Sequence, residues 1–391
     1  MRPEGRLMID ICPGGENRTL ATISSSRPLG LTRTFQGQRP EEVVQMLPLL
    51  FSVCGMAQGV AAAEAVERAL DVEVAAPTRV ARQLLVLAET AREHLICAVR
   101  DWSRASGLTP DGAAILRIMQ VSERVRTAID PQRSAKSIGA VPCLDREKIA
   151  AAIEALAETI ERVVLGEPIA DFLSRATAAD FRKWHQTKTT PAQALIEMIS
   201  VRGWEKLGNA KTRHLPWTCG VRLSSVLLGD NSRNFIATPT WEGEPAETTV
   251  LSRQLGQAVV GEHARLFGTG LLTRLIARIV EIARLPAGMR KIVASEQPDG
   301  GWPIASSKLG DNEGIAEVDA ARGRLVHAVS IEAGIVRRYA ILAPTEWNFH
   351  PAGTAARGLQ QIEDVGADVL VLANLFISAL DPCVGFEVRV H

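Results

Sequence analysis

Two cysteines far apart in the sequence, Cys54 and Cys383, have neighbours that suit metal chemistry. Cys54 stands next to Gly55, where it interrupts a helical pattern, and Cys383 follows Asp381 and Pro382 close to the C-terminus. A deprotonated cysteine is a soft ligand for metals such as iron and zinc. A buried cysteine can also act as a small apolar side chain, so either residue alone predicts little. As a pair they are the strongest candidates for chemistry in this sequence.

The other cysteines and the common ligand-binding motifs add no second candidate. The remaining cysteines are widely spaced, form no CxxC pair and do not match zinc-finger spacing. We expect them to be reduced thiols with a packing role: Cys12, Cys97, Cys143 and Cys219. The chain has no phosphate-binding loop, and Gly268-Thr269-Gly270 lacks the third glycine of a dinucleotide motif, so it predicts a turn between two helices.

Composition excludes several classes of partner. The 391 residues include 44 Lys+Arg and 44 Asp+Glu, so the formal net charge is zero and no overall field attracts nucleic acid or anionic lipid. Aromatic residues make up only 4%, which disfavours a base-stacking surface. No apolar run reaches the roughly 18 residues of a membrane span, and the first residues lack the apolar core of a secretory signal. We therefore expect a cytoplasmic protein without a membrane span or a nucleic-acid partner.

Apolar periodicity predicts a helical core between two regions of short strands. Alternating residues predict strands over 5–12 and 18–34. Helical spacing predicts helices over 40–51, 56–70, 77–105, 110–129, 145–165, 190–207 and 249–283. After these helices we expect a Gly/Ser-rich loop over 299–314, strands over 315–343 with a turn at Ala333-Gly334, helices over 354–363 and 366–380, and a short tail.

These elements predict a single domain over residues 1–391, of the mainly α (α+β) class. We expect an N-terminal β/helix segment over 1–72, a helical bundle over 77–283 and a C-terminal β/helix segment over 290–391. The sequence contains no internal repeat and no linker long enough to force a division. A site that uses both Cys54 and Cys383 requires this fold to bring the two ends of the chain together.

Short segments along the chain resemble, in order, the motifs of the large subunit of NiFe hydrogenases. Each motif is weak alone, and the ordered set is specific: Arg2–Leu7, Phe35–Gly37 with Arg39–Pro40, Cys54–Gly55, Ala321–His327, Ala343–Asn348 and Asp381–Cys383. The resemblance covers both ends of the chain well and the middle poorly. It implies the fold of that family, a core of long helices with small β elements built from both chain ends.

The departures from the family motifs bear on function. The family holds nickel and iron with four thiolates, and the second cysteine of each motif bridges the two metals. Those positions are Ala57 and Phe386 in this sequence, and neither side chain has an atom that ligates a metal. The histidine that ends the C-terminal motif is replaced by Arg389, while His391 lies two residues further on and is a candidate ligand. The resemblance therefore implies no nickel, no hydrogen turnover and no enzymatic activity.

The side of the pocket that binds cyanide in that family is similar here. Arg322 matches the arginine that lies against the diatomic ligands, where it could donate charge-assisted hydrogen bonds to cyanide. Pro344 and Thr345 match the segment that hydrogen-bonds the other cyanide, and Asp381 could orient Arg322 or a cysteine. Glu4 matches a glutamate that transfers protons in the family, and it is either a pocket residue or a salt-bridged structural carboxylate.

This combination of retained and lost residues resembles the HupK/HoxV-type hydrogenase accessory proteins. Low-spin iron that carries one carbonyl and two cyanides needs few protein ligands, and the thiolates of Cys54 and Cys383 could hold it. The resemblance implies a non-catalytic scaffold that holds or helps to assemble this transient Fe(CN)2CO group. It also implies two partners, a small HypC-type chaperone and the apo-large subunit of a NiFe hydrogenase, to which the group passes.

Two other functions remain open from the sequence. A metal-free pseudoenzyme could act as an interaction platform in hydrogenase maturation, and a divergent hydrogenase with an altered metal site is less favoured. Bound iron separates the scaffold from the platform, and hydrogen-dependent dye reduction identifies the hydrogenase. Three nearby residues have ordinary structural roles in our interpretation: Trp347 in the core, His327 in a buried hydrogen bond and His350 in a turn.

Overall fold

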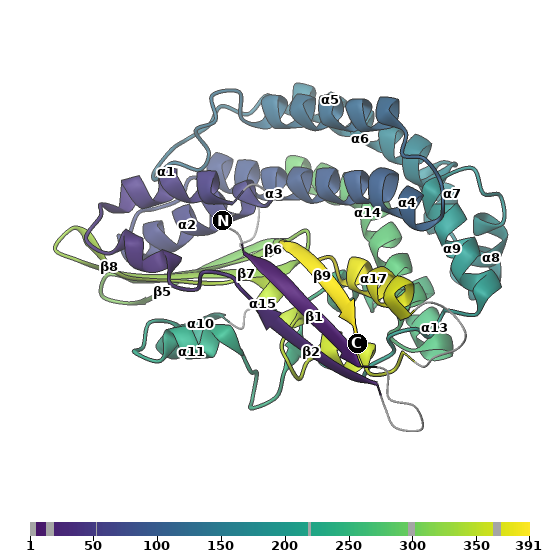
Figure 1. Cartoon of the computed structure of the whole chain (residues 1–391). Helices are drawn as coiled ribbons and strands as arrows, with labels where there is room; N and C mark the ends of the chain where they lie inside the picture. Colours follow the sequence, from purple (N-terminus) through teal and green to yellow (C-terminus); the bar gives the residue numbers. More distant parts are fainter. Residues whose placement is uncertain (1–4, 13–18, 52, 218–219, 296–301, 363–368) are drawn as a thin grey trace.

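The computed structural model describes residues 5–12, 19–51, 53–217, 220–295, 302–362 and 369–391. Glu4 and Cys219, both named from the sequence, lie outside these described residues. A bundle of long helices lies beside a four-stranded sheet, and a three-stranded sheet formed by both chain ends lies next to them (Figure 1). The expected mainly α (α+β) class is confirmed.

The larger sheet is an antiparallel meander of β5 (Ile304–Gly310), β6 (Glu313–Ala320), β7 (Gly323–Glu332) and β8 (Ile335–Leu342). The turn at Ala333-Gly334 between β7 and β8 is confirmed. The loop expected over 299–314 is wrong in part, because β5 falls within it. This strand is at the edge of the sheet and is half-exposed along most of its length, so its sequence lacks the apolar alternation of a buried strand.

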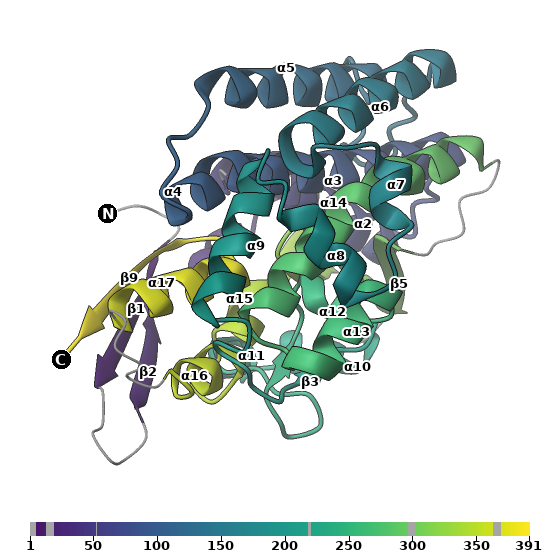
Figure 2. The same ribbon diagram turned by 90° about the vertical axis from the view of Figure 1, so that its right-hand side faces the viewer.

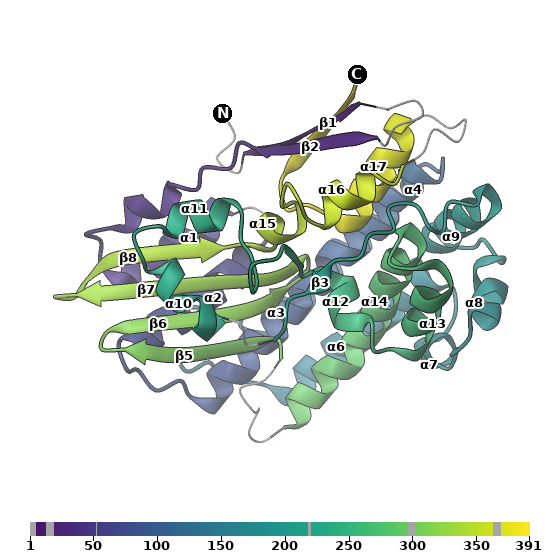
Figure 3. The same cartoon turned by 90° about the horizontal axis from the view of Figure 1, so that it is seen from below.

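Helices cover both faces of this sheet (Figure 3). On one face α2 (Gly55–Ala69) contacts β5, β6 and β7, with α1 (Pro40–Leu50) packed behind it. On the other face α10 (Gly220–Leu227) contacts the same strands and is packed against α11 (Ser232–Ala237). The contact with α2 is so close that a Cβ on Gly314 would lie 2.0 Å from the carbonyl oxygen of Ala65. Glycine is therefore required where β6 passes under α2.

The bundle consists of α3 (Ala76–Ile96), α5 (Gly112–Ile129), α6 (Arg146–Ile160) and α14 (Leu271–Ala294). The helices expected over 77–105 and 145–165 are present, and each contains a π-helical segment near its end. One segment, Cys97–Trp102, joins α3 to α4 (Ser103–Ala105), and the other, Glu161–Leu165, ends α6. The helix expected over 249–283 is three helices, α12 (Val250–Gln254), α13 (Ala258–Phe267) and α14, and the turn at Gly268-Thr269-Gly270 joins the last two as expected.

Both ends of the chain meet in the smaller sheet, which has the order β2-β1-β9 (Figure 2). Its strands are β1 (Arg6–Cys12), β2 (Leu20–Ser25) and β9 (Gly385–Val390). β9 is parallel to β1, and Phe386 lies opposite Leu7. The short tail expected after residue 380 is wrong in part, because residues 385–390 form a strand once β1 lies beside them. Only the tertiary structure supplies that partner.

Shorter elements connect these parts: a 3-10 helix (Leu31–Phe35), α7 (Ile169–Leu173), α8 (Ala178–His185), α9 (Pro191–Arg202), β3 (Arg213–His214), β4 (Ala246–Glu247), α15 (Pro344–Asn348), α16 (Thr354–Leu359) and α17 (Val369–Leu380).

Trp347 is fully buried and His350 lies in a turn, as expected. Cys97 is buried, whereas Cys12 and Cys143 are exposed, so the packing role expected of these two is wrong. Among the described helices, none is both long and apolar enough to cross a bilayer.

Candidate functional site

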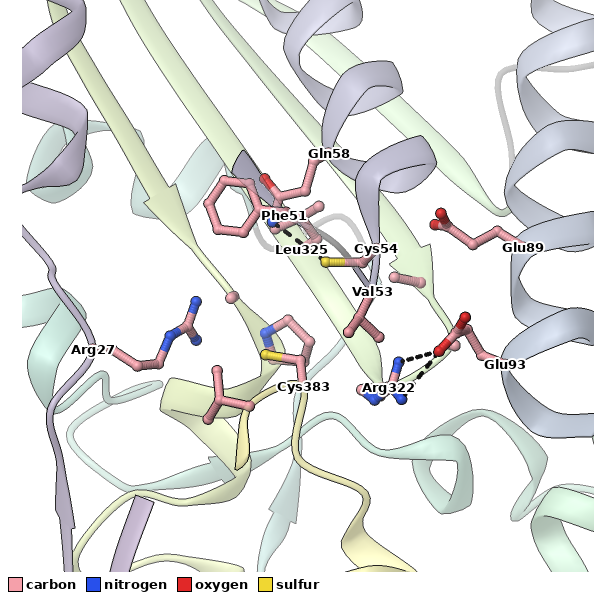
Figure 4. Close-up of a pocket in the computed structure, with 15 residues that line it drawn as sticks. Arg27, Phe51, Val53, Cys54, Gln58, Glu89, Glu93, Arg322, Leu325 and Cys383 are labelled. Carbon is pink, nitrogen blue, oxygen red and sulfur yellow. Dashed lines mark hydrogen bonds and ion pairs between the residues drawn. The ribbon is translucent and has the colours of Figure 1, made fainter. Parts of the chain in front are cut away.

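Cys54 and Cys383 line the same cavity, which has a volume of about 30 Å³ (Figure 4). Arg322 and Pro344, both named from the sequence, line it as well. The cavity lies where the start of α2, the turn between β6 and β7, and the connection from α17 to β9 meet. We refer to it below as the thiol cavity. The two ends of the chain thus contribute one thiol each.

The position of Cys54 is fixed by Glu89, a residue of α3 that also lines the thiol cavity. Cys54 is the N-cap of α2, and helix N-termini have free backbone N–H groups. The carboxylate of Glu89 accepts hydrogen bonds from Met56 N at 2.8 Å and from Ala57 N at 2.9 Å. It therefore caps α2 and fastens the residue that carries the first thiol to the helical bundle.

Gln58 forms the wall of the cavity beside Cys54. Its Nε2 lies 3.8 Å from Cys54 Sγ, and its Oε1 accepts a hydrogen bond from His327 Nε2 at 2.9 Å. The other ring nitrogen of His327 lies 2.9 Å from the hydroxyl of Tyr339, which donates to it. Burial lowers the pKa of His327 to about 3, so the ring is neutral. The role expected for His327, a buried hydrogen bond, is confirmed, and the ring holds the Gln58 amide toward the sulfur.

Cys54 is half-buried, and its thiol lies among groups that disfavour its ionised form. Burial raises the pKa of Cys54 far above its ordinary value, and the nearby Cys383 and Glu89 raise it further. The positive charge of Arg322 and the hydrogen bond from Gln58 act in the opposite direction and are smaller effects. Cys54 is consequently a neutral thiol at neutral pH, and a metal that binds it must displace a proton.

Cys383 lies between the end of α17 and the start of β9, and its sulfur is 2.8 Å from the hydroxyl oxygen of Thr345. Thr345 belongs to the first turn of α15, directly after Pro344. Thr345 thus contacts the second thiol and holds it in place. Both cysteines are free thiols in the structure.

Arg322 is buried between two carboxylates on one side of the cavity. Its guanidinium nitrogens lie 3.3 Å from Glu93 Oε2 and 3.4 Å from Asp381 Oδ1. Arg278 approaches Asp381 to 3.6 Å from the other side. Burial by itself would raise the pKa of Asp381, but these guanidinium groups hold it below its ordinary value. Asp381 is therefore ionised, and it orients Arg322 toward the cavity.

Arg27 is a second cation of the thiol cavity, and the sequence analysis missed it. Its guanidinium lines the cavity on the other side of Cys383 from Arg322 (Figure 4). Behind it, Nη1 lies 2.8 Å from Oε1 of Glu346, and both side chains are nearly buried. Glu346 lines a neighbouring hollow and does not line the thiol cavity. The cavity therefore faces the positive end of this ion pair.

The remaining residues named from the sequence lie elsewhere. His391 Nε2 is 2.9 Å from Asp10 Oδ1 at the exposed end of the smaller sheet, and His391 does not line the thiol cavity. Ala57 is buried in the first turn of α2, and Phe386 packs against the core from β9. No group of three or more His, Cys, Asp or Glu side chains in the described ranges is placed to hold a metal ion.

The polar groups around the cavity are suited to a ligand that accepts hydrogen bonds. Arg27 and Arg322 offer only N–H donors, and the Oε1 of Gln58 is already bound by His327. All four carboxylate oxygens on the cavity wall also have partners: those of Glu89 bind the backbone of α2, and those of Glu93 bind Arg92 and Arg322. The cavity therefore combines two soft thiols with guanidinium donors and has no uncommitted carboxylate to complete a metal's coordination.

Known proteins that match this sequence over most of its length include several hydrogenase expression/formation proteins. The sequence is 31% identical over 390 residues to the hydrogenase expression/formation protein HoxV of Cupriavidus necator, and the match covers 94% of this chain and 92% of HoxV. The chain belongs to the HoxV/HupK family. A second member, HupK of Rhizobium leguminosarum, is 28% identical and is matched over 99% of this chain and 97% of its own length. No protein-family model matches the sequence.

The fold of this HoxV/HupK family member is that of a hydrogenase large subunit. The NiFeSe hydrogenase of Desulfomicrobium baculatum superposes with a TM-score of 0.63 at 15% sequence identity, over 95% of this chain and 94% of the hydrogenase chain. The resemblance inferred from the sequence motifs is confirmed for both the family and the fold.

The residues that the sequence analysis missed share one property. Arg27, Gln58, Glu89 and Glu93 lie on elements whose local pattern indicates only a strand end or a helix. Glu89 and Glu93 are spaced by four residues on α3, so one face of this helix presents two carboxylates to the cavity. That spacing was a usable signal. The position of Arg27 had no local signal, because its partner Glu346 is more than 300 residues away.

The carboxyl group of Glu89, which caps α2, should make the stability of the protein depend on pH. Burial raises the pKa of Glu89 from 4.5 to about 7, so between these pH values the folded state binds more protons than the unfolded state. The stability associated with the protonated carboxyl is present below pH 4.5 and is lost as the pH rises through about 7. We expect the unfolding free energy of the wild type, relative to Glu89→Gln, to fall by up to about 3 kcal/mol over this window.

Denaturant unfolding at a series of pH values measures this difference. Glu158→Gln, at an exposed position of α6, is the matched control and should differ from the wild type by a constant amount. A difference between the wild type and Glu89→Gln that does not change with pH would contradict the assignment.

Proposed function

We propose that this protein holds an iron atom that carries its own diatomic ligands, the Fe(CN)2CO group, as cargo during the maturation of a NiFe hydrogenase. Cys54 and Cys383 are the residues that bind the iron. The observation that supports this most directly is the make-up of the thiol cavity: two soft ligands, two guanidinium groups, and carboxylates that are already bound, among apolar side chains. A metal that brings its own acceptor ligands suits such a cavity, and a bare metal ion does not.

The cargo is negatively charged, and two positively charged side chains flank one of the thiols. Ferrous iron with two cyanides and two cysteine thiolates carries a net charge of about −2 by formal count, and the carbonyl is neutral. The cavity presents two guanidinium groups, Arg27 and Arg322, on either side of Cys383. Cyanide nitrogen accepts hydrogen bonds, and an N–H donor that is itself charged strengthens them. Binding displaces a proton from each thiol that is neutral beforehand, so alkaline pH favours loading.

A site with only two thiolates is suited to holding the iron group rather than to catalysis. The positions that would supply bridging thiolates to a second metal are Ala57 and Phe386, so the donors for a nickel–iron centre are missing. A cargo held through two protein bonds is also easier to release than one held through four. This suits transfer to a partner with a complete set of ligands, which we take to be the apo-large subunit of a hydrogenase.

The partners follow from the same proposal. The relatives are named hydrogenase expression/formation proteins, which supports a place in the maturation machinery. We propose a small HypC-type chaperone as the donor of the iron group and the apo-large subunit as its acceptor. The interaction platform without metal is the alternative function, and the measurements below separate it from the scaffold.

Removal of either thiol should abolish iron binding. The variants Cys54→Ala and Cys383→Ala would be produced together with the maturation proteins and purified without oxygen. We expect each to retain no more than about one tenth of the iron of the wild type. Elemental analysis of iron per chain measures this. Cys143→Ala is the matched control, because Cys143 is an exposed cysteine outside the cavity, and it should retain the wild-type content. Equal iron in all three variants would overturn the two-thiolate site.

Arg27 should decide which kind of metal the cavity accepts. In Arg27→Gln/Glu346→Gln both charges of the buried pair are removed together, so no lone charge is left buried. We expect this variant to bind bare Zn²⁺ about tenfold more tightly than the wild type, because a positive charge near the metal is gone, and to retain less of the anionic iron group.

Equilibrium dialysis against Zn²⁺ and iron analysis provide the two readouts. The control, Arg39→Gln/Glu42→Gln, removes an exposed ion pair outside the cavity and should leave both unchanged. Unchanged or weaker Zn²⁺ binding in the Arg27 variant would contradict this selectivity.

A further inference from the structure

A second, larger hollow lies on the other side of the turn between β6 and β7. This hollow, here called the α14 cleft, has a volume of about 580 Å³, and α12 and α14 form much of its wall. Apolar and aromatic side chains line one part of it, among them Leu173, Leu285 and Trp302. The ring of Trp302 lies over Gly288 of α14, where a Cβ would come within 3.9 Å of it. The cleft has the size and mixed lining that are typical of small-molecule sites.

The α14 cleft is positively charged, although the whole chain is neutral. Four cationic side chains line it against two carboxylates: Arg253, Arg284, Lys291 and Arg324 against Glu281 and Asp319. Arg284 and Lys291 are seven residues apart on α14, on the same side as Gly288, and both are exposed. Neither forms an ion pair with another described residue. An anion entering the cleft would therefore meet uncompensated positive charge.

Two buried polar atoms of the cleft have no hydrogen-bond partner within the described part of the chain. They are Nη1 of Arg253, whose side chain is 10% exposed, and Oε1 of Gln254, whose residue is 7% exposed. The other nitrogens of Arg253 bind Glu281, and Nε2 of Gln254 does the same. Leaving a buried donor and acceptor unpaired is unfavourable. A ligand with an oxygen for the guanidinium and a hydroxyl for the amide would satisfy both.

The cleft and the thiol cavity share one hairpin turn. Ala320, Ala321 and Arg322 line the thiol cavity, whereas the flanking residues Asp319 and Arg324 line the α14 cleft. Arg253 links the two sites, because it lines the α14 cleft and its Nη2 donates to the carbonyl oxygen of Ala321 at 3.3 Å. A movement of Arg253 or Arg324 toward a ligand in the cleft thus acts on the turn that carries Arg322.

We propose that the α14 cleft binds a small molecule in which an oxyanion, a phosphate or a carboxylate, is attached to an apolar or aromatic body. The oxyanion binds at Arg253, Arg284 and Lys291, and the body lies against Trp302. Occupancy of the cleft changes the exposure of the thiol cavity through the turn that holds Arg322. The site is separate from the two cysteines, and its test does not depend on iron.

Phenyl phosphate is the probe, and isothermal titration calorimetry on the full chain measures its binding. We expect phenyl phosphate to bind more tightly than inorganic phosphate, and benzyl alcohol to show no binding. Arg284→Ala/Lys291→Ala should weaken phenyl phosphate binding by about tenfold or more. Arg290→Ala, which removes an exposed arginine of α14 outside the cleft, should leave it unchanged.

An equal loss of phenyl phosphate binding in Arg284→Ala/Lys291→Ala and in Arg290→Ala would overturn the site. So would phenyl phosphate binding that is abolished by a chloride salt at the same ionic strength. A hexaglutamate peptide tests whether the cleft instead binds the carboxylates of an acidic protein segment. Binding of the peptide that is tighter than that of phenyl phosphate and is lost in Arg284→Ala/Lys291→Ala would assign the cleft to an acidic protein segment and overturn the small-molecule proposal.

The coupling between the sites is tested on the metal-free protein. Iodoacetamide modification of Cys54 and Cys383, followed by mass spectrometry of the peptides, reports the exposure of the thiol cavity. We expect saturating phenyl phosphate to change the modification rate of at least one of these thiols by about threefold or more, and to leave the exposed Cys143 unaffected. Binding without any change at Cys54 and Cys383 would overturn the coupling.

Discussion

The buried guanidinium of Arg322 joins the three parts of the chain that make the thiol cavity. It belongs to the turn between β6 and β7, and its partners are Glu93 of α3 and Asp381 at the end of α17. A buried charge without partners is strongly unfavourable, so each part is stable in its position only when the other two are in place. Because α3 also carries the cap of α2, and the residues after α17 include Cys383, this ion-pair cluster fixes the relative positions of both thiols.

The thiol cavity lies in a chain with the fold of a hydrogenase large subunit. The large-subunit fold brings a thiol from near each end of the chain to one place, and the parallel pairing of β1 with β9 completes that arrangement. Ala57 and Phe386 stand where bridging thiolates would be expected, and hydrogen-bond donors such as Arg27 face the cavity. We propose that these differences suit the cavity to holding an iron group rather than to catalysis.

The sequence was a good guide to the long helices and to the motif residues. Apolar periodicity located α5 and α6 because each helix buries one face along its whole length, and it located α3 although that helix is buried on most sides. It failed for β5 and β9, since these edge strands lack the alternating buried residues of β2 and become apparent only beside their partners. The same reason explains the missed contribution of Arg27, which depends on a distant Glu346, and the misplaced candidate His391, which is near Cys383 in sequence but lies at the far end of β9.

Infrared spectroscopy tests the central claim most directly, because carbonyl and cyanide bound to iron absorb where proteins do not. The protein would be purified without oxygen from a host that contains the complete hydrogenase maturation machinery. We expect one carbonyl band and two cyanide bands, all lost in Cys54→Ala. A protein that shows no band in this region and contains no iron would contradict the scaffold and favour an interaction platform without metal.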